Sequence, residues 1–95
     1  MQITNEDIKN AILQIAGTYP VLSVILFGSR ANGTNRPDSD VDLIMEFYSP
    51  VSILTLSEIT CRLEEILHLD VDVIHGPVKP DDMIETGAEV LLYAA

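Results

Sequence analysis

The segment Val21–Phe27, VLSVILF, constrains the fold of this chain more than any other stretch of the sequence. It is almost continuously apolar and rich in β-branched residues, a pattern typical of a β-strand that is covered on both faces. Gly28 ends this strand, and the segment Asp40–Phe47 is interpreted as a second one. Buried strands need other elements packed against them, so the sequence predicts a layered domain.

Apolar residues before and after these two strands recur at helical spacing. They predict a helix over Asn5–Ala16, whose first turn Thr4 can cap, and a longer helix over Ser52–Leu67. Leu69–Ile74 alternates apolar and acidic residues, as a third strand would, and Asp81-Asp82 is expected to begin a short C-terminal helix. The predicted fold class is α+β, a layered α/β arrangement whose sheet is protected by helices on at least one side.

Length and composition limit how the chain is organised. Its 95 residues, 47% of them hydrophobic, suit one compact domain over residues 1–95, because a chain this short has nothing left for a second core. The sequence has no apolar N-terminal signal, no apolar run of membrane length and one cysteine, which argues against secretion, membrane insertion and a disulfide framework. We predict a cytoplasmic protein, in which Cys61 is a core or half-buried thiol.

The charge balance restricts the partners of the protein. Five basic residues stand against 15 acidic ones, and the formal net charge is −10. Phosphate backbones repel such a surface, so direct contact with a nucleic acid is disfavoured unless a metal or a second protein supplies positive charge. A basic protein is the more natural partner.

Two aspartates at the start of the second predicted strand carry the strongest chemical signal. Side chains two residues apart in a strand point to the same face, so Asp40 and Asp42 lie side by side while Val41 and Leu43 point into the core. Each carboxylate disfavours the charge on the other. Mg²⁺ reverses that cost, since it binds carboxylate oxygens and leaves positions for substrate phosphates. The pair therefore resembles half of a metal site.

A third acid can complete this site if the third predicted strand lies beside the second. Asp70 and Asp72 share one parity in that strand, and both are candidates. We prefer Asp72, because Val71 and Val73 flank it at mid-strand and are expected to bury it, whereas Asp70 at the strand's start could be solvated. The alternative is that both acids are the polar face of a half-exposed strand.

The turn after the first strand fits the same chemistry. Gly28 allows the backbone to pass close to a ligand, and Ser29 heads a predicted short helix with Arg30 and Ala31. Its hydroxyl and the first N–H groups could face a phosphate. A Gly-Ser turn that follows a buried strand and precedes Asp-x-Asp on the next one is a more specific signal than either feature alone.

These motifs resemble a known family. GSRANG followed by SDVDL, with VDVI further on, is similar to the nucleotidyltransferase superfamily that includes DNA polymerase beta and the kanamycin nucleotidyltransferases. The small size, the early helix and the ending near VLLY resemble the prokaryotic minimal nucleotidyltransferases, the antitoxin partners of HEPN-domain toxins. The resemblance covers nearly the whole chain and implies a mixed sheet flanked by helices, the polymerase beta-like nucleotidyltransferase fold.

The resemblance also implies roles for individual residues. Gly28 and Ser29 match the Gly-Ser that holds the β- and γ-phosphates of the nucleotide, while Asp40, Asp42 and Asp72 match the metal-binding and catalytic acids. Ser29 would position phosphate and would not act as a nucleophile, because no histidine or lysine is placed to activate it.

Five further positions are considered, and the first three follow from the same comparison. Arg30 and Ser39 are expected among the nucleotide contacts, although a structural salt bridge is an alternative for Arg30. Asn32 departs from the family, since relatives often carry Arg or Lys there, so one positive charge that could assist the triphosphate is missing. His68 and His75 are interpreted as structural or solvated residues and not as metal ligands.

The implied activity is transfer of AMP from ATP to a hydroxyl, that of a tyrosine, of a cognate HEPN toxin, by a mechanism that uses two Mg²⁺ ions. Asp40 and Asp42 would bridge the ions, and Asp72 would act as the general base. Two alternatives remain open at this stage. One is an antitoxin that neutralises its partner by binding alone, and the other is a nucleotidyltransferase for a small molecule such as an aminoglycoside.

Overall fold

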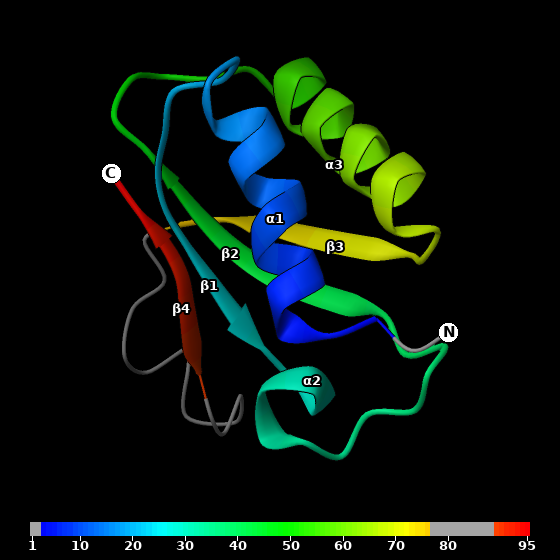
Figure 1. Ribbon diagram of the computed structural model, residues 1–95. Helices are drawn as coiled ribbons and strands as arrows, with labels where there is room; N and C mark the ends of the chain where they lie inside the picture. The colour runs from blue at the N-terminus through cyan, green and yellow to red at the C-terminus, as the bar shows by residue number, and fades with distance from the viewer. Residues whose placement is uncertain (1–2, 77–88) are drawn as a thin grey trace.

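The computed structural model describes residues 3–76 and 89–95. In chain order, its elements are α1 (Asn5–Ala16), β1 (Val21–Phe27), α2 (Ser29–Asn32), β2 (Val41–Phe47), α3 (Ile53–Leu67), β3 (Val71–His75) and β4 (Val90–Ala94). The strands form one sheet in the order β3-β2-β1-β4, and the two long helices α1 and α3 lie side by side against one face of it (Figure 1).

The sheet is mixed. β1 pairs antiparallel with both β2 and β4, whereas β2 pairs parallel with β3. The parallel pair is connected through α3, the kind of crossover that neighbouring strands need when they run in the same direction. The predicted α+β class, with a mixed sheet flanked by helices, is confirmed.

Local hydrogen bonds explain where the two long helices begin. At α1, the Thr4 hydroxyl accepts a hydrogen bond from the Asp7 N–H at 3.1 Å, and the Asp7 carboxylate accepts one from the Thr4 N–H at 2.8 Å. At α3, the Ser52 hydroxyl accepts one from the Thr55 N–H at 3.2 Å, so Ser52 is the cap and not the first helical residue. None of the helices in the described ranges is both long and apolar enough to cross a membrane.

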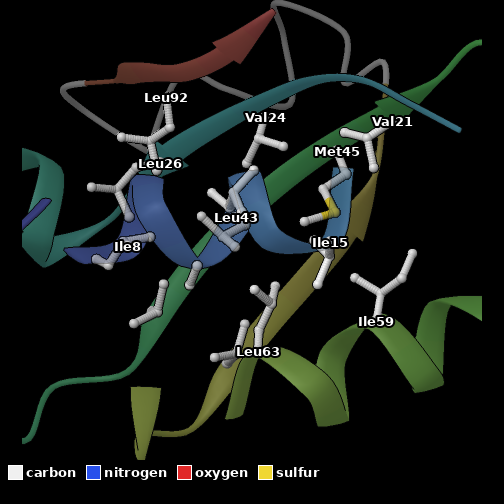
Figure 2. Packing of buried hydrophobic residues seen from close by; sticks show 14 of the residues in the cluster. Ile8, Ile15, Val21, Val24, Leu26, Leu43, Met45, Ile59, Leu63 and Leu92 are labelled. Carbon is white, nitrogen blue, oxygen red and sulfur yellow. The ribbon is translucent and has the colours of Figure 1, made fainter. Parts of the chain in front are cut away.

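The core lies between the sheet and the two long helices. Figure 2 shows Val24, Leu26, Leu43 and Met45 from the two central strands opposite apolar side chains of α1 and α3. Among the helical members of this cluster, Ile8, Ile12, Ile59 and Leu63 are 0% exposed. β1 and β2 are the two central strands of the sheet, and their side chains on the helix-covered face are buried. The residues that follow β1 and those that precede β2 are therefore attached to the packed centre of the described structure.

The structure differs from the sequence prediction in the way β1 is covered. Both long helices lie on the same face of the sheet, so β1 alternates buried residues with exposed or half-buried ones. Leu22, for example, is 39% exposed while Val24 is 0% exposed. The expectation that Val21–Phe27 is covered on both faces is therefore wrong within the described residues.

Strand boundaries and one whole strand also differ from the prediction. β2 begins one residue later than expected, and β3 covers Val71–His75 where Leu69–Ile74 was predicted. β4 was not predicted, because VLLYA is short and becomes a strand by pairing with β1. The helix expected to begin at Asp81-Asp82 lies outside the described residues.

Cys61 differs from its prediction as well. It was interpreted as a core or half-buried thiol, but it is exposed on α3. The buried stripe of that helix is made of Ile59, Leu63 and Leu67, and Cys61 does not share their spacing.

We expect the core to respond strongly to truncation at Leu63, which is 0% exposed. Leu63→Ala should lower the free energy of unfolding by about 2–4 kcal/mol, because it removes buried methyl groups and leaves a cavity. Urea denaturation followed by circular dichroism measures this change. Leu54→Ala is the matched control, since Leu54 lies on the same helix but is 78% exposed and should cost less than about 1 kcal/mol. Equal losses in the two variants would contradict the described packing.

Candidate active site

The turn after β1 lies against the carboxylate of Asp42. Phe27, the last residue of β1, pairs with Asp42 of β2, and Gly28 follows Phe27 directly. A Cβ atom at Gly28 would lie 2.6 Å from Asp42 Oδ2, so the Asp42 carboxylate would have to shift to make room for it. Gly28 also has φ +77° and ψ −155°, a conformation that only glycine adopts readily. The backbone conformation therefore requires glycine at this position, and a side chain there would also displace the Asp42 carboxylate.

Ser29 begins α2 immediately after this turn. The carbonyl of Gly28 accepts hydrogen bonds from the N–H groups of Ala31 and Asn32, both at 3.1 Å, which closes the first turn of the short helix. The close contact at Gly28 therefore brings the Gly-Ser pair and the start of β2 together, as the order of the two motifs in the sequence suggested.

Asp72 lies on the other side of Asp42. β3 is parallel to β2, and their register pairs Asp42 with Asp72. Directly paired residues project to the same face of a sheet, so the two carboxylates are neighbours. Asp72 is exposed, which makes the burial argument that favoured it wrong. The strand register, and not flanking valines, brings Asp72 to this position.

Asp70 has a different environment. Its carbonyl accepts a hydrogen bond from the Val41 N–H at 2.9 Å, which connects the beginnings of β2 and β3. Its side chain lines a surface hollow together with Asp38, Glu64 and His68. Asp70 thus supports the strand pairing through its backbone, while Asp72 is the acid paired with Asp42.

The electrostatics of Asp42 reflect its neighbours. Partial burial raises the pKa of the Asp42 carboxyl above its usual value, and the negative charges of Asp72 and Asp40, together with a hydrogen bond to Asp72, raise it further. All three acids therefore act on the same region. Oxygen ligands of this kind suit Mg²⁺, and a cation would relieve the repulsion between them.

The donor set fits magnesium in its chemistry, although it is not assembled into a finished coordination shell. Among residues 3–76 and 89–95, no three His, Cys, Asp or Glu side chains are already grouped closely enough to hold a metal ion. His68 ends α3 with φ +57° and is exposed, and His75 lies against the ring of Phe47 with 5.3 Å between ring centroids. The acids of β2 and β3 are thus the candidate ligands.

Arg30 occupies a position that sequence reasoning did not foresee. Its side chain is buried, with 4% of its surface exposed, and its guanidinium donates hydrogen bonds to the carbonyl oxygens of Ile3, Pro37 and Ser39. This placement does not favour the expected phosphate contact, and the partners are carbonyls and not the carboxylate of a salt bridge. No sequence pattern could have indicated this, because every residue has a carbonyl.

Ser39, also expected among the nucleotide contacts, closes a turn before Asp40. Its hydroxyl accepts a hydrogen bond from the Arg36 N–H at 2.8 Å, and its own N–H donates to the Arg36 carbonyl at 3.0 Å. The candidate site therefore consists of Gly28 and Ser29 beside Asp42 and Asp72, with Asp40 directly before β2.

Sequence comparison assigns the family. A family model described as "Nucleotidyltransferase domain" matches residues 6–89, so the chain belongs to the nucleotidyltransferase domain family. The protein adenylyltransferase MntA of Thermococcus cleftensis is 30% identical over 95 residues, which cover 96% of each chain. Two proteins of Methanocaldococcus jannaschii whose names provisionally assign them as protein adenylyltransferases are 38% identical, and there the match spans 57% of the relative's length.

Solved structures share the fold. A chain from the crystal structure of a toxin–antitoxin pair with AMP-PNP superposes with a TM-score of 0.75 at 20% identity, covering 92% of this chain and 73% of that one. A chain from the complex of a tri-AMPylated Shewanella oneidensis HEPN toxin with its MNT antitoxin gives a TM-score of 0.71 at 17% identity, covering 97% and 74%. The expected nucleotidyltransferase fold is confirmed.

We expect Gly28 to be irreplaceable for structural reasons. Gly28→Ala should lower the free energy of unfolding by about 2–4 kcal/mol, because the new Cβ adds a contact with Asp42 to a backbone conformation that alanine avoids. Gly33→Ala is the matched control, since Gly33 also has a positive φ, +75°, but nothing lies within 4 Å of its Cβ position. That control should cost about 1 kcal/mol. Chemical denaturation of both variants tests whether the conformation and surroundings of Gly28, ψ −155° beside Asp42, are more demanding than those of Gly33, ψ +15° in open space, and equal costs would contradict this.

The repulsion at Asp42 gives a second prediction. A raised folded-state pKa means that ionised Asp42 destabilises the fold at neutral pH, and that this cost disappears as the pH falls below the carboxyl's unfolded value. In EDTA at pH 7, Asp42→Asn should therefore raise the melting temperature by roughly 2–4 °C.

Three further conditions test this explanation by differential scanning fluorimetry. The difference should vanish at low pH, and millimolar Mg²⁺ should stabilise the unmodified protein more than the variant. Glu65→Gln removes one exposed charge from α3 and should change the melting temperature by less than about 1 °C. A variant that melts below the unmodified protein in EDTA would show that Asp42 is not under repulsion.

Proposed function

We propose that this protein transfers AMP from ATP to a side-chain hydroxyl, that of a tyrosine, of a HEPN-domain toxin and neutralises the toxin in this way. The observation that carries the proposal is the Gly28–Ser29 turn packed against Asp42, which is itself paired with Asp72, in a chain of the nucleotidyltransferase family. Phosphate-binding and acidic groups are thereby brought to one place.

The reaction is an in-line displacement. The acceptor oxygen forms a bond to the α-phosphorus of ATP, the bond from that phosphorus to the oxygen bridging the β-phosphate breaks, and pyrophosphate leaves with the electron pair. The acceptor's proton passes to a carboxylate oxygen of Asp72. Asp72 is suited to this role because it is exposed beside Asp42 and can meet a second macromolecule.

The other residues bind and orient the nucleotide. Gly28 has no side chain to block the approach of the β- and γ-phosphates, and the hydroxyl of Ser29 is a donor for them. Asp40, Asp42 and Asp72 are the residues that would hold two Mg²⁺ ions, and these supply positive charge for the triphosphate and the attacking oxygen. Because the chain has a net charge of −10, that positive charge is needed for a triphosphate to approach.

The identity of the acceptor is supported by charge and by the relatives. A strongly acidic protein fits a basic partner, and a toxin that acts on RNA has a basic surface. The similar protein of Thermococcus cleftensis is named a protein adenylyltransferase, and the similar fold from Shewanella oneidensis is part of a complex with an AMPylated HEPN toxin. We place the reaction in the cytoplasm, where ATP and Mg²⁺ are abundant.

Intact mass spectrometry tests this function directly. The protein encoded beside this gene, incubated with the chain, ATP and Mg²⁺, should gain one or more AMP units, and peptide mapping should place them on tyrosine. The gain should be lost with EDTA and with Asp40→Asn, because both remove the metal. Glu65→Gln, which removes one exposed acid from α3, should retain the gain and serves as the matched control.

Other outcomes would replace the proposal with a different function. A stable complex between the two proteins with no change in mass would indicate an antitoxin that acts by binding alone. Adenylylation of a purified aminoglycoside in the absence of any partner protein would indicate a small-molecule nucleotidyltransferase.

A further inference from the structure

Arg30 is the second residue of α2, immediately after the Gly28–Ser29 turn, and its charged side chain is 4% exposed. Its Nε and Nη2 donate to the Ser39 carbonyl at 3.2 and 2.9 Å, its Nη2 also donates to the Pro37 carbonyl at 3.3 Å, and its Nη1 donates to the Ile3 carbonyl at 3.2 Å. The guanidinium donates these bonds from three separate nitrogens in one plane, whereas the three donors of a lysine ammonium all leave one nitrogen and cannot reproduce that geometry.

These contacts fix the backbone that leads to Asp40. The Ser39 carbonyl, bound twice by Arg30, belongs to the peptide unit that joins Ser39 to Asp40. On the other side of Asp40, the Val41 N–H donates to the Asp70 carbonyl at 2.9 Å. The side chain of Asp40 is exposed, but the peptide units before and after it are both held by hydrogen bonds.

We propose that Arg30 is a positioning residue, which holds Asp40 at a set distance from the Gly28–Ser29 turn by binding the carbonyls of Pro37 and Ser39. The inference deepens the proposed function and rests on it. The phosphates of ATP would lie at the turn and the metal at the aspartates, so their relative position determines whether the α-phosphorus is correctly aligned. A misplacement of about 1 Å can reduce the rate of such a reaction about 100-fold.

A direct role of Arg30 in binding phosphate makes different predictions. A phosphate contact would need an accessible guanidinium, and its loss would weaken the binding of ATP, while lysine would restore part of that binding through its charge. A positioning role through carbonyl oxygens predicts that lysine is nearly as damaging as an uncharged side chain. It also predicts that the loss is in kcat and not in the KM for ATP.

Steady-state kinetics of AMP transfer by Arg30→Lys and Arg30→Met separate these roles. We expect kcat to fall about 10- to 100-fold in both variants, with the KM for ATP changed by less than about threefold. Lys9→Met is the control for the loss of one positive charge, since Lys9 is exposed on α1, and it should retain kcat within about twofold. Recovery of kcat by Arg30→Lys, or a large rise in the KM of Arg30→Met with kcat retained, would overturn the proposal.

Hydrogen exchange by NMR tests the inference without any assay of activity. In the unmodified protein without nucleotide, the Arg30 Nε–H should exchange at least about tenfold more slowly than the Nε–H of Arg36, which is exposed. In Arg30→Lys, the backbone N–H of Val41 should lose protection. If the Arg30 and Arg36 side chains exchange equally fast, the proposal is wrong even where the variants do not fold.

The two experiments also keep the two proposals apart. If the unmodified protein transfers no AMP, the proposed function is wrong, and the exchange rates still decide whether Arg30 holds the segment before Asp40. If AMP is transferred but Arg30 is unprotected, the function stands and the positioning role is overturned.

Discussion

The contact between Gly28 and the carboxylate of Asp42 is the constraint on which the candidate site depends. It exists because β1 and β2 are paired to their ends, with Phe27 opposite Asp42, and because no side chain at position 28 intervenes. The turn that would receive phosphates is thus brought against the acids that would receive metal. A larger residue would have to push the turn away from β2 or displace Asp42, and either movement separates the two halves of the site.

β2 is central to this arrangement, because it is paired with β1 on one edge and with β3 on the other. Alternate residues of β2 face opposite sides of the sheet and serve different purposes. Leu43 and Met45 are packed beneath the helices (Figure 2). Asp42 lies on the opposite face of the strand, beside its pairing partner Asp72. Burial of the apolar residues therefore fixes which way the acids point, since a slip of one residue would exchange the two faces. The core specifies the site as well as the stability of the fold.

The acidic residues of the candidate site lower the free energy of unfolding, whereas burial of the apolar core raises it. Ionised Asp42 is placed beside Asp40 and Asp72 in a chain that already has a net charge of −10. Such repulsion is tolerable in a small domain because the acids are half-buried or exposed, where water screens them, and because a bound cation removes it. The buried Arg30 contributes in another way, since its guanidinium binds the backbone carbonyls of Pro37 and Ser39, just before Asp40.

Within the described residues, the amino-acid sequence by itself indicated α1, α2, α3 and three of the four strands, and it marked Asp40 and Asp42 as neighbouring acids. These features follow from periodicity, capping and alternation, which depend on residues close together in the chain. α1 and β1 begin and end where the sequence predicted, and the mixed sheet was expected from the family resemblance.

Only the tertiary structure decided which elements meet. It paired Asp72 with Asp42 by the parallel register of β3, although the sequence argument from burial was wrong for Asp72. It made VLLYA a strand at the edge of β1 and assigned the guanidinium of Arg30 to three carbonyls. Strand register and hydrogen bonds to the backbone join residues far apart in sequence, and their partners carry no distinguishing side-chain pattern. For that physical reason they could not be predicted from the order of the residues alone.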